Sequence, residues 1–245
     1  MKLFAISFVL FLFFGCSSNP SLKVATSANM KSAMVDIVNL FQEIHDVDID
    51  IIDGASGKLA SQIEFGAPYD VFVSADTKYP TYLYDSGLAV EKPKVYGCGK
   101  LVLWSLKDIL PNFDILKTSK IHSIAVANPK TAPYGELTKT VLINAGIYEG
   151  IEDKLVFGES IGQCDQYITS KSVDIGITSM ASVKSKQMKS VGHWVEVDSN
   201  LYDFLPQSAV LVKTKITHPK AKLFYEFLCS DEVKVILRKY GYQVD

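Results

Sequence analysis

Short apolar runs alternate with longer stretches of helical periodicity along almost the whole chain. Residues 31–45, for example, have apolar side chains at Ala33, Met34 and Ile37, a spacing that places them on one face of a helix. Shorter runs such as residues 22–27 have the length of buried strands. The predicted strands are residues 22–27, 47–52, 71–74, 101–104, 123–127, 155–157, 175–178 and 209–212, and the predicted helices are residues 31–45, 57–65, 76–86, 136–144, 159–171, 219–229 and 231–240. Repeated alternation of strands and helices predicts an α/β protein with parallel sheets and helices on both faces.

The length of 245 residues fits two α/β lobes better than one very large sheet. We expect the boundaries between the lobes near residues 97–99 and 205–207. Residues 1–20 then form a leader and linker, residues 21–98 together with 206–245 form the first lobe, and residues 99–205 form the second lobe. Because the C-terminal segment returns to the first lobe, two crossings join the two doubly wound sheets and form a hinge.

The N-terminus has the pattern of an export signal. Lys2 precedes an apolar run over residues 3–14, which is followed by Gly15 and Cys16. This run is shorter than the ~20 residues that cross a bilayer as a helix. The segment Gly15-Cys16-Ser17 resembles a bacterial lipobox, in which the cysteine becomes the lipidated first residue of the mature protein. A plain signal peptide that is cleaved nearby is the alternative. Both interpretations predict export, and a lipid on Cys16 would attach the protein to a membrane face.

The charged residues nearly balance, with a formal net charge of −2 at pH 7. This balance excludes a general nucleic-acid-binding surface, because binding to phosphates needs a clustered positive field. The basic residues are 24 lysines and one arginine, Arg238 near the C-terminus. An anion site elsewhere in the chain must therefore work without the guanidinium fork that ordinarily grips phosphate and carboxylate.

The loops that follow the predicted strands are rich in Ser, Thr, Asn and Gly. These loops are residues 27–29, 53–57, 74–76, 128–135, 158–162 and 178–179. Ligands of open α/β sheets bind beyond the carboxyl ends of the strands, where helix N-termini converge. Each loop by itself is typical of helix capping. Several of them in one cleft would hold a dianion without a basic residue, because each helix N-terminus carries roughly half a positive charge.

The sequence lacks the motifs of the common catalytic sites. Residues 54–58 are too short for a phosphate-binding P-loop, and Leu59 stands where that motif needs Ser or Thr. Ser56 does not lie in a Gly-x-Ser-x-Gly segment. The four histidines are scattered and form no ligand pair. We therefore expect a protein that is not an enzyme, with no cofactor and no directly bound metal.

Three cysteines follow the leader: Cys98, Cys164 and Cys229. They form no C-x-x-C pair and no zinc-ligand spacing. We expect them to be small buried apolar side chains. A single disulfide in an oxidising compartment is the alternative, and the sequence does not choose the pair.

A series of ordered motifs extends from Val24 to Tyr242. The motifs are Gly54-Ala55-Ser56-Gly57-Lys58-Leu59-Ala60, Gly66-Ala67-Pro68, Asp70-Val71-Phe72, Ser74-Ala75-Asp76, Gly99-Lys100-Leu101-Val102-Leu103-Trp104-Ser105, Asn128-Pro129 with Ala132-Pro133-Tyr134-Gly135, Gly158-Glu159-Ser160, Gln207 with Ala209-Val210-Leu211, and Lys239-Tyr240-Gly241-Tyr242. Each motif alone is weak evidence of kinship. In combination they show that the chain resembles the periplasmic molybdate-binding proteins of bacterial ABC transporters.

The resemblance implies a two-lobed type II periplasmic-binding-protein fold that closes on one tetrahedral oxyanion, molybdate or tungstate. The residues that it implies as oxyanion contacts are Ala28, Asn29 and Ser56 in the first lobe and Tyr134 and Ile161 in the second. Ile161 is implied to contribute its backbone N–H. Asn29, Ser56 and Ile161 also stand at the starts of predicted helices, which agrees with the pattern of the loops. The implied partner is the ABC transporter permease, and we expect a monomer.

Two serines depart from the pattern of the family. Ser27 stands where the family more often has Ala, and Ser179 stands where some members place a ligand Tyr, so the sequence leaves open whether either one contacts the oxyanion. Two other functions also stay open. One is a binding protein of the same fold for sulfate, thiosulfate or ferric iron. The other is a tethered oxyanion sensor lipoprotein without a role in transport.

Overall fold

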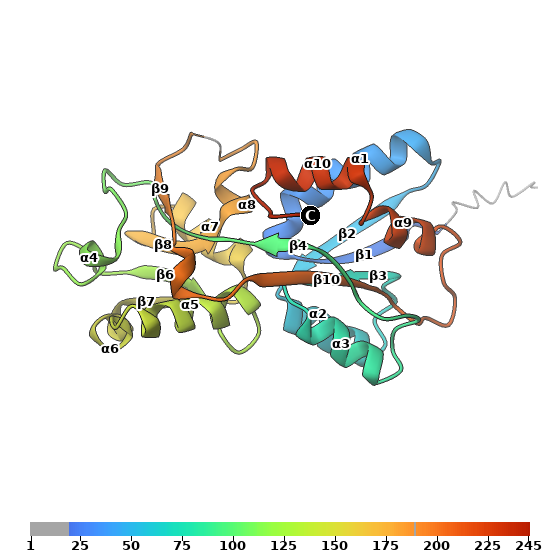
Figure 1. Cartoon of the computed structure of the whole chain (residues 1–245), viewed down its shortest axis with the longest axis horizontal. Helices are drawn as coiled ribbons and strands as arrows, with labels where there is room; N and C mark the ends of the chain where they lie inside the picture. The colour runs from blue at the N-terminus through green and yellow to red at the C-terminus, as the bar shows by residue number, and fades with distance from the viewer. Residues whose placement is uncertain (1–19, 189) are drawn as a thin grey trace, which may run out of the picture.

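The computed structural model describes residues 20–188 and 190–245, and the strands in these residues form two five-stranded sheets (Figure 1). The first sheet has the order β2-β1-β3-β10-β4, and the second has the order β7-β6-β8-β5-β9. The strands are β1 (Leu22–Ser27), β2 (Ile49–Gly54), β3 (Val71–Val73), β4 (Lys94–Gly99), β5 (Leu101–Ser105), β6 (Ile124–Ala127), β7 (Leu155–Gly158), β8 (Ile175–Ser179), β9 (His193–Glu196) and β10 (Leu205–Leu211). Each sheet with its helices is one lobe. The predicted leader and Cys16 lie outside the described residues.

The helices differ in length from single turns to four turns. The α-helices are α1 (Lys31–Ile44), α2 (Ser56–Glu64), α3 (Lys78–Asp85), α4 (Phe113–Leu116), α5 (Pro133–Asn144), α6 (Tyr148–Ile151), α7 (Ile161–Thr169), α8 (Met180–Val183), α9 (Ala221–Phe227) and α10 (Asp231–Lys239). Short 3-10 helices are η1 (Ala28–Met30), η2 (Glu152–Lys154) and η3 (Ser199–Leu201). No helix within the described ranges is both long and apolar enough to cross a membrane.

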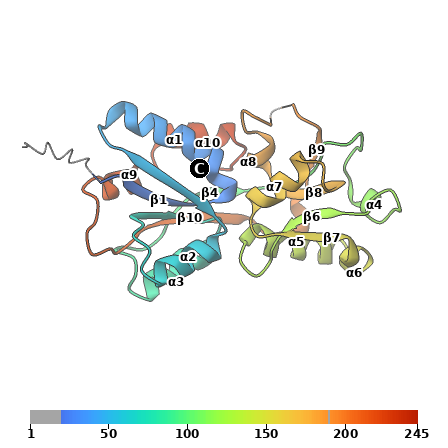
Figure 2. The same ribbon diagram turned by 180° about the vertical axis from the view of Figure 1, so that it is seen from behind.

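In the first lobe, α1, α9 and α10 cover one face of the sheet, and α2 and α3 cover the other (Figures 1 and 2). The apolar stripe of α1 is buried as its spacing predicts, and Phe41 meets Phe224 of α9 edge-on at a ring distance of 5.1 Å. The start of α10 is fixed by Ser230, whose hydroxyl accepts a hydrogen bond from the Val233 N–H. These two helical layers bury both faces of the first sheet.

In the second lobe, α5 and α6 lie on one side of the sheet and α7 and α8 on the other (Figures 1 and 2). The core between these layers contains Trp104 of β5 and Ile175 and Ile177 of β8, all inaccessible to solvent. The indole N–H of Trp104 donates to the Val191 carbonyl at 2.9 Å, so this large ring is buried without an unsatisfied donor.

The chain crosses between the lobes at two places. It passes from β4 to β5 through Lys100, and it returns through residues 197–204 between β9 and β10. β4 and β10 are antiparallel neighbours, with Leu205 opposite Gly99. The C-terminal segment adds to this pair, because Cys98 and Gln243 exchange two backbone hydrogen bonds of 2.8 and 3.0 Å. The crossings are therefore tied into the first sheet.

Both sheets are mixed, so the prediction of parallel sheets was wrong for part of each. β1 is parallel to β2 and β3, and β6 is parallel to β7 and β8, as strand–helix alternation predicts. In contrast, β10 is antiparallel to β3 and β4, and β5 is antiparallel to β8 and β9. These two strands arrive directly from the other lobe. No helix of their own lobe leads into either strand from the preceding strand of its sheet, so nothing in the local periodicity sets their direction.

Two strands were not predicted. β4 contains two glycines and lies where the sequence indicated a boundary between lobes. All four residues of β9 are exposed, and its apolar run is only two residues long, Trp194 and Val195. β10 also begins four residues earlier than predicted, at Leu205. The three described cysteines are free; Cys164 is buried, and Cys98 and Cys229 are partly buried.

Asp174, just before β8, joins the segment before β6 to the segment after β5, the two strands that flank β8 in the sheet. Its carboxylate accepts hydrogen bonds from the backbone N–H groups of His122 and Ser123 at 2.7 and 3.0 Å and pairs with Lys107. Burial raises the pKa of Asp174, but the hydrogen bonds and the Lys107 ammonium outweigh it and lower the pKa to about 2. The folded protein thus keeps this carboxylate ionised at a pH where the unfolded chain is protonated.

We predict that Asp174→Asn lowers the free energy of unfolding near neutral pH. The stabilisation by a depressed pKa is present above the unfolded value of 3.8 and is lost as the pH falls toward about 2, so the difference from wild type should shrink over that interval. Urea unfolding followed by tryptophan fluorescence measures the free energy of unfolding at each pH, because both tryptophans lie in this lobe. Asp203→Asn, at an exposed position, is the control. An equal difference at neutral and acid pH would contradict the prediction.

Candidate functional site

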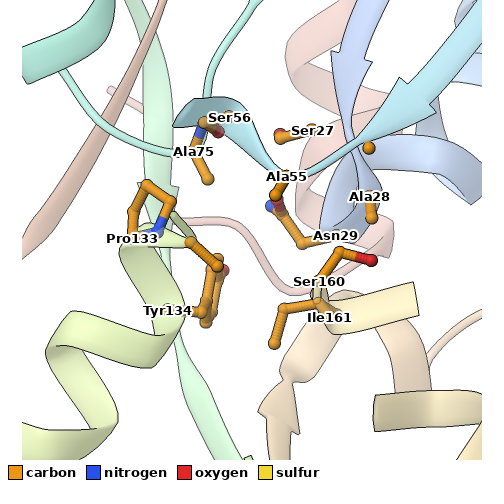
Figure 3. A pocket seen from close by; sticks show the side chains of 12 residues that line it. Ser27, Ala28, Asn29, Ala55, Ser56, Ala75, Pro133, Tyr134, Ser160 and Ile161 are labelled. Carbon is orange, nitrogen blue, oxygen red and sulfur yellow. The ribbon is translucent and has the colours of Figure 1, made fainter. Parts of the chain in front are cut away.

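A small cavity lies between the lobes, where the carboxyl ends of strands from both sheets face each other (Figure 3). The residues that line it are Ser27, Ala28, Asn29, Gly54, Ala55, Ser56 and Ala75 from the first lobe and Ala132, Pro133, Tyr134, Ser160 and Ile161 from the second. Its volume of about 10 Å³, the space open to the centre of a water-sized sphere, is far below the ~300–1,000 Å³ of pockets that bury drug-sized molecules. The cavity therefore suits a solute of a few atoms.

The lining contains no acidic or basic side chain among the described residues. Nor do the described residues bring together three or more His, Cys, Asp or Glu side chains that could hold a metal ion. Polar character in the cavity comes from hydroxyl groups, one amide and backbone N–H groups. Such a site recognises a solute by hydrogen bonds, without a formal countercharge.

Several helices begin at the cavity: η1, α2, α5 and α7. The N–H groups in the first turn of a helix have no acceptor within that helix. The residues that precede α2 and α5 are Ala55 and Ala132, which have no side-chain group to cap them. Free N–H groups and the positive ends of the helix dipoles consequently face the cavity, and this combination favours an anion.

Ser56 is the first residue of α2 and is 1% exposed. Its Oγ accepts a hydrogen bond from the Ala75 N–H at 3.0 Å. This bond fixes the hydroxyl at the wall of the cavity and uses one of its lone pairs. The hydroxyl proton of Ser56 remains able to donate to a solute.

The side-chain amide of Asn29 donates its hydrogen bonds to other residues of the protein rather than to the cavity. Its Nδ2 donates to Gln207 Oε1 at 3.0 Å and to Tyr242 Oη at 2.9 Å. Both amide protons are therefore used within the protein. A contact from Asn29 to a solute would use its backbone N–H in η1.

Tyr134 comes from α5 in the other lobe and is 1% exposed. Gln207, on β10, donates from Nε2 to Tyr134 Oη at 3.1 Å. Burial raises the pKa of Tyr134 above its ordinary value, although the hydrogen bond from Gln207 opposes the shift. The phenol stays protonated, and because its oxygen accepts from Gln207, its proton can point into the cavity.

Two glycines allow the lobes to approach each other here. A Cβ on Gly99 would overlap Tyr134 Oη and Gln207 Nε2, so only glycine leaves room for their hydrogen bond. At the other wall, the Gly57 N–H donates to the Thr131 carbonyl across the lobes at 2.9 Å. A Cβ on Gly57 would also come within 2.9 Å of that carbonyl oxygen. The structure shows the two lobes in direct contact around the cavity.

Ion pairs also join the lobes around the cavity. In the described residues, these pairs are Lys58–Glu159 at 2.7 Å, Lys186–Asp36 at 2.8 Å and Lys78–Glu136 at 3.5 Å. All three lysines are more than half exposed, and the two pairs in which the carboxylate is exposed as well, Lys58–Glu159 and Lys78–Glu136, contribute about 0–1 kcal/mol each. They hold the rim weakly and leave the cavity itself free of formal charge.

The structure brings all five predicted site residues to this one cavity: Ala28, Asn29, Ser56, Tyr134 and Ile161. Figure 3 shows Tyr134 and Ile161 facing Ala28, Asn29 and Ser56 across it. Ser27 also lines the cavity, whereas Ser179 is not among the lining residues. The Ser179 hydroxyl instead caps α8, where it accepts from the Ser182 N–H at 3.1 Å.

Some lining residues were missed by the sequence analysis. Ala55, Ala75, Ala132 and Pro133 carry no polar side-chain group that would have marked them. One available signal was overlooked: proline is favoured at the first position of a helix, and α5 begins at Pro133 rather than at residue 136 as predicted. The sequence could not predict that Gln207 bonds to both Asn29 and Tyr134, because these partners are distant from it in the chain.

Known proteins resemble this chain over nearly its whole length. The molybdate-binding protein ModA of Rhodobacter capsulatus is 37% identical over 221 residues, which cover 89% of this chain and 86% of that protein. The putative ABC transporter substrate-binding lipoprotein YvgL of Bacillus subtilis is 27% identical over 94% of this chain and 93% of its own length.

The solved structure of the periplasmic molybdate-binding protein of Azotobacter vinelandii superposes with a TM-score of 0.86 at 31% identity, covering 92% of this chain and 100% of that chain. This likeness confirms the predicted two-lobed α/β fold. The family model for bacterial extracellular solute-binding proteins matches residues 22–243, a range that includes both lobes and both crossings. The chain therefore belongs to the family of bacterial extracellular solute-binding proteins.

Proposed function

We propose that this protein captures molybdate, or tungstate, in the cavity between its lobes and delivers the oxyanion to the permease of an ABC transporter. The observation that carries the proposal is the cavity itself, which is small, closed by both lobes and lined by neutral hydrogen-bond donors. The molybdate-binding relatives at 37% and 31% identity give the chemical identity of the solute.

The proposed contacts come from both lobes. The backbone N–H groups of Ala28 and Asn29 and the hydroxyl of Ser56 donate from the first lobe. The hydroxyl of Tyr134 and the backbone N–H of Ile161 donate from the second. Because each lobe supplies only part of the coordination, the oxyanion gains its full set of hydrogen bonds only when the lobes meet. Binding therefore stabilises the closed state, which is the form that a permease would recognise.

The state of the donors supports selectivity for a fully ionised tetrahedron. Ser56 Oγ already accepts from the Ala75 N–H, and Tyr134 Oη already accepts from Gln207. These groups present protons to the cavity, and a molybdate dianion accepts hydrogen bonds at every oxygen. A phosphate that keeps one proton would bring an O–H without a good acceptor, which is costly in a buried site. Sulfate, which is smaller, would make longer hydrogen bonds.

We further propose that the protein works outside the cytoplasm as a monomer, with Cys16 attached to a lipid. Capture and release of an oxyanion break no covalent bond, so the function requires neither catalysis nor a cofactor. The lipobox-like segment at Cys16 supports the anchor, as does the similarity to a putative substrate-binding lipoprotein.

Calorimetric titration of the purified protein with molybdate, tungstate, sulfate and phosphate tests the proposed ligand. We expect molybdate and tungstate to bind tightly and with similar affinity, because the two anions have the same charge and nearly the same size. Sulfate and phosphate should bind much more weakly for the reasons above. Sulfate binding as tight as molybdate binding would reassign the ligand, and a visible charge-transfer colour with ferric iron would indicate an iron-binding protein.

Ser56→Ala tests the assignment of the site. We expect molybdate binding to weaken by ~1–3 kcal/mol, or roughly 5- to 150-fold, because a hydrogen bond to a charged acceptor is lost. Ser61→Ala, on the same helix but outside the cavity lining, is the matched control and should bind like wild type. Calorimetry gives the affinities. Thermal unfolding without ligand reports any loss of stability that follows because the Ala75 N–H no longer has the Ser56 hydroxyl as its acceptor. Normal binding by Ser56→Ala would refute this contact.

A further inference from the structure

A buried hydroxyl in the cavity wall has no hydrogen-bond partner in the part of the chain that the structure describes. Ser27, the last residue of β1, is 2% exposed, and its Oγ has no hydrogen-bond partner of ordinary length and angle among the described residues. The polar group beside it is the Tyr96 hydroxyl, which donates to the Ser74 carbonyl and to Gln207 Oε1. Buried hydroxyls are almost always hydrogen-bonded, because water is lost on burial and must be replaced. The Ser27 hydroxyl thus has a hydrogen-bonding capacity that the folded chain itself does not use.

Helix capping does not explain this serine. Ser27 occupies the position before η1, where serine is favoured as a cap, yet it makes no side-chain cap hydrogen bond. Three other serines in equivalent positions do cap their helices: Ser160, Ser179 and Ser230 each accept from a backbone N–H three residues later. Ser27 is therefore a capping residue by position whose hydroxyl is left free.

The position of Ser27 at the cavity allows its hydroxyl to donate to a solute instead of to the protein. The residue lines the cavity beside Ala28 and Asn29 (Figure 3). Ala28 has no polar side chain, and both amide protons of Asn29 are used by Gln207 and Tyr242. Without Ser27, the end of β1 would offer the cavity backbone N–H groups only. A hydroxyl without a protein acceptor can turn its proton toward an anion in the cavity.

We propose that the Ser27 hydroxyl donates a hydrogen bond to the bound oxyanion and so is a further determinant of its affinity. This inference rests on the proposed function. It gives the first lobe two hydroxyl donors, Ser27 and Ser56, opposite the hydroxyl of Tyr134. The carboxyl ends of β1 and β2 then each place one hydroxyl against the anion, because Ser27 ends β1 and Ser56 follows β2 by two residues.

The neighbouring residue supplies a matched control. Thr26 is also inaccessible to solvent, and its Oγ1 likewise lacks a hydrogen-bond partner among the described residues. Thr26 does not line the cavity. Thr26→Val and Ser27→Ala therefore each remove one unsatisfied buried hydroxyl from adjacent positions of the same strand, but only the second change alters the cavity.

The experiment compares wild type, Ser27→Ala and Thr26→Val by calorimetric titration with molybdate and by thermal unfolding without ligand. We expect Ser27→Ala to weaken molybdate binding by roughly 10- to 150-fold, the change that corresponds to a hydrogen bond to a charged group. Thr26→Val should bind like wild type. The melting temperatures without ligand should be unchanged or higher in both variants, because each loses an unsatisfied polar group.

Two results would overturn the inference while leaving the proposed function intact. One is Ser27→Ala binding molybdate as tightly as wild type while Ser56→Ala is weakened. The other is Thr26→Val losing as much affinity as Ser27→Ala, which would place the effect in the strand rather than in the hydroxyl. Failure of the wild-type protein itself to bind molybdate or tungstate would instead refute the proposed function, and with it the identity of the acceptor.

Discussion

Uncharged hydrogen-bond donors that meet between two lobes are the feature on which the architecture of this protein depends. Each donor is weak by itself, and each helix start contributes roughly half a charge. A dianion is therefore held only where several such groups converge in a dry space. This requirement explains why alanines precede α2 and α5 at the cavity, whereas Asn112, Ser179 and Ser230 cap helices elsewhere. Ser160 does cap α7 at the cavity, but its hydroxyl accepts from the Gln163 N–H and not from that of Ile161. A capping side chain before α2 or α5 would accept hydrogen bonds from N–H groups at the start of these helices.

The hinge and the cavity share residues. In each lobe, the strand that arrives from the other lobe is inserted between strands joined by a helix: β10 between β3 and β4, and β5 between β8 and β9. Gln207 lies on the first of these inserted strands and bonds to Asn29 in one lobe and Tyr134 in the other. Any rotation about the crossings must change the Gln207–Tyr134 contact, so the direction of the Tyr134 hydroxyl depends on the relative position of the lobes.

Formal charges are confined to the surroundings of the cavity. The lysines that join the lobes are paired with carboxylates at the exposed rim, where water and salt weaken each interaction. A lysine inside the cavity would attract any anion and would discriminate little among dianions. Neutral donors of fixed direction instead recognise the shape and protonation state of the solute. The separation of rim charges from interior donors thus suits a protein that must choose among similar oxyanions.

The sequence by itself determined the alternation of strands and helices, the residues of the main helices and the loops that carry the site. These features follow from local periodicity and from motifs such as residues 54–60, which are contiguous in the chain. Only the tertiary structure decided the direction of β5 and β10, the pairing of the exposed strand β9 and the network around Gln207. It also showed that both amide protons of Asn29 are donated within the protein and that the hydroxyl of Ser27 lacks a hydrogen-bond partner among residues 20–188 and 190–245. The physical reason is that a residue's type fixes how many hydrogen bonds it can make, whereas the fold decides which partners are within reach.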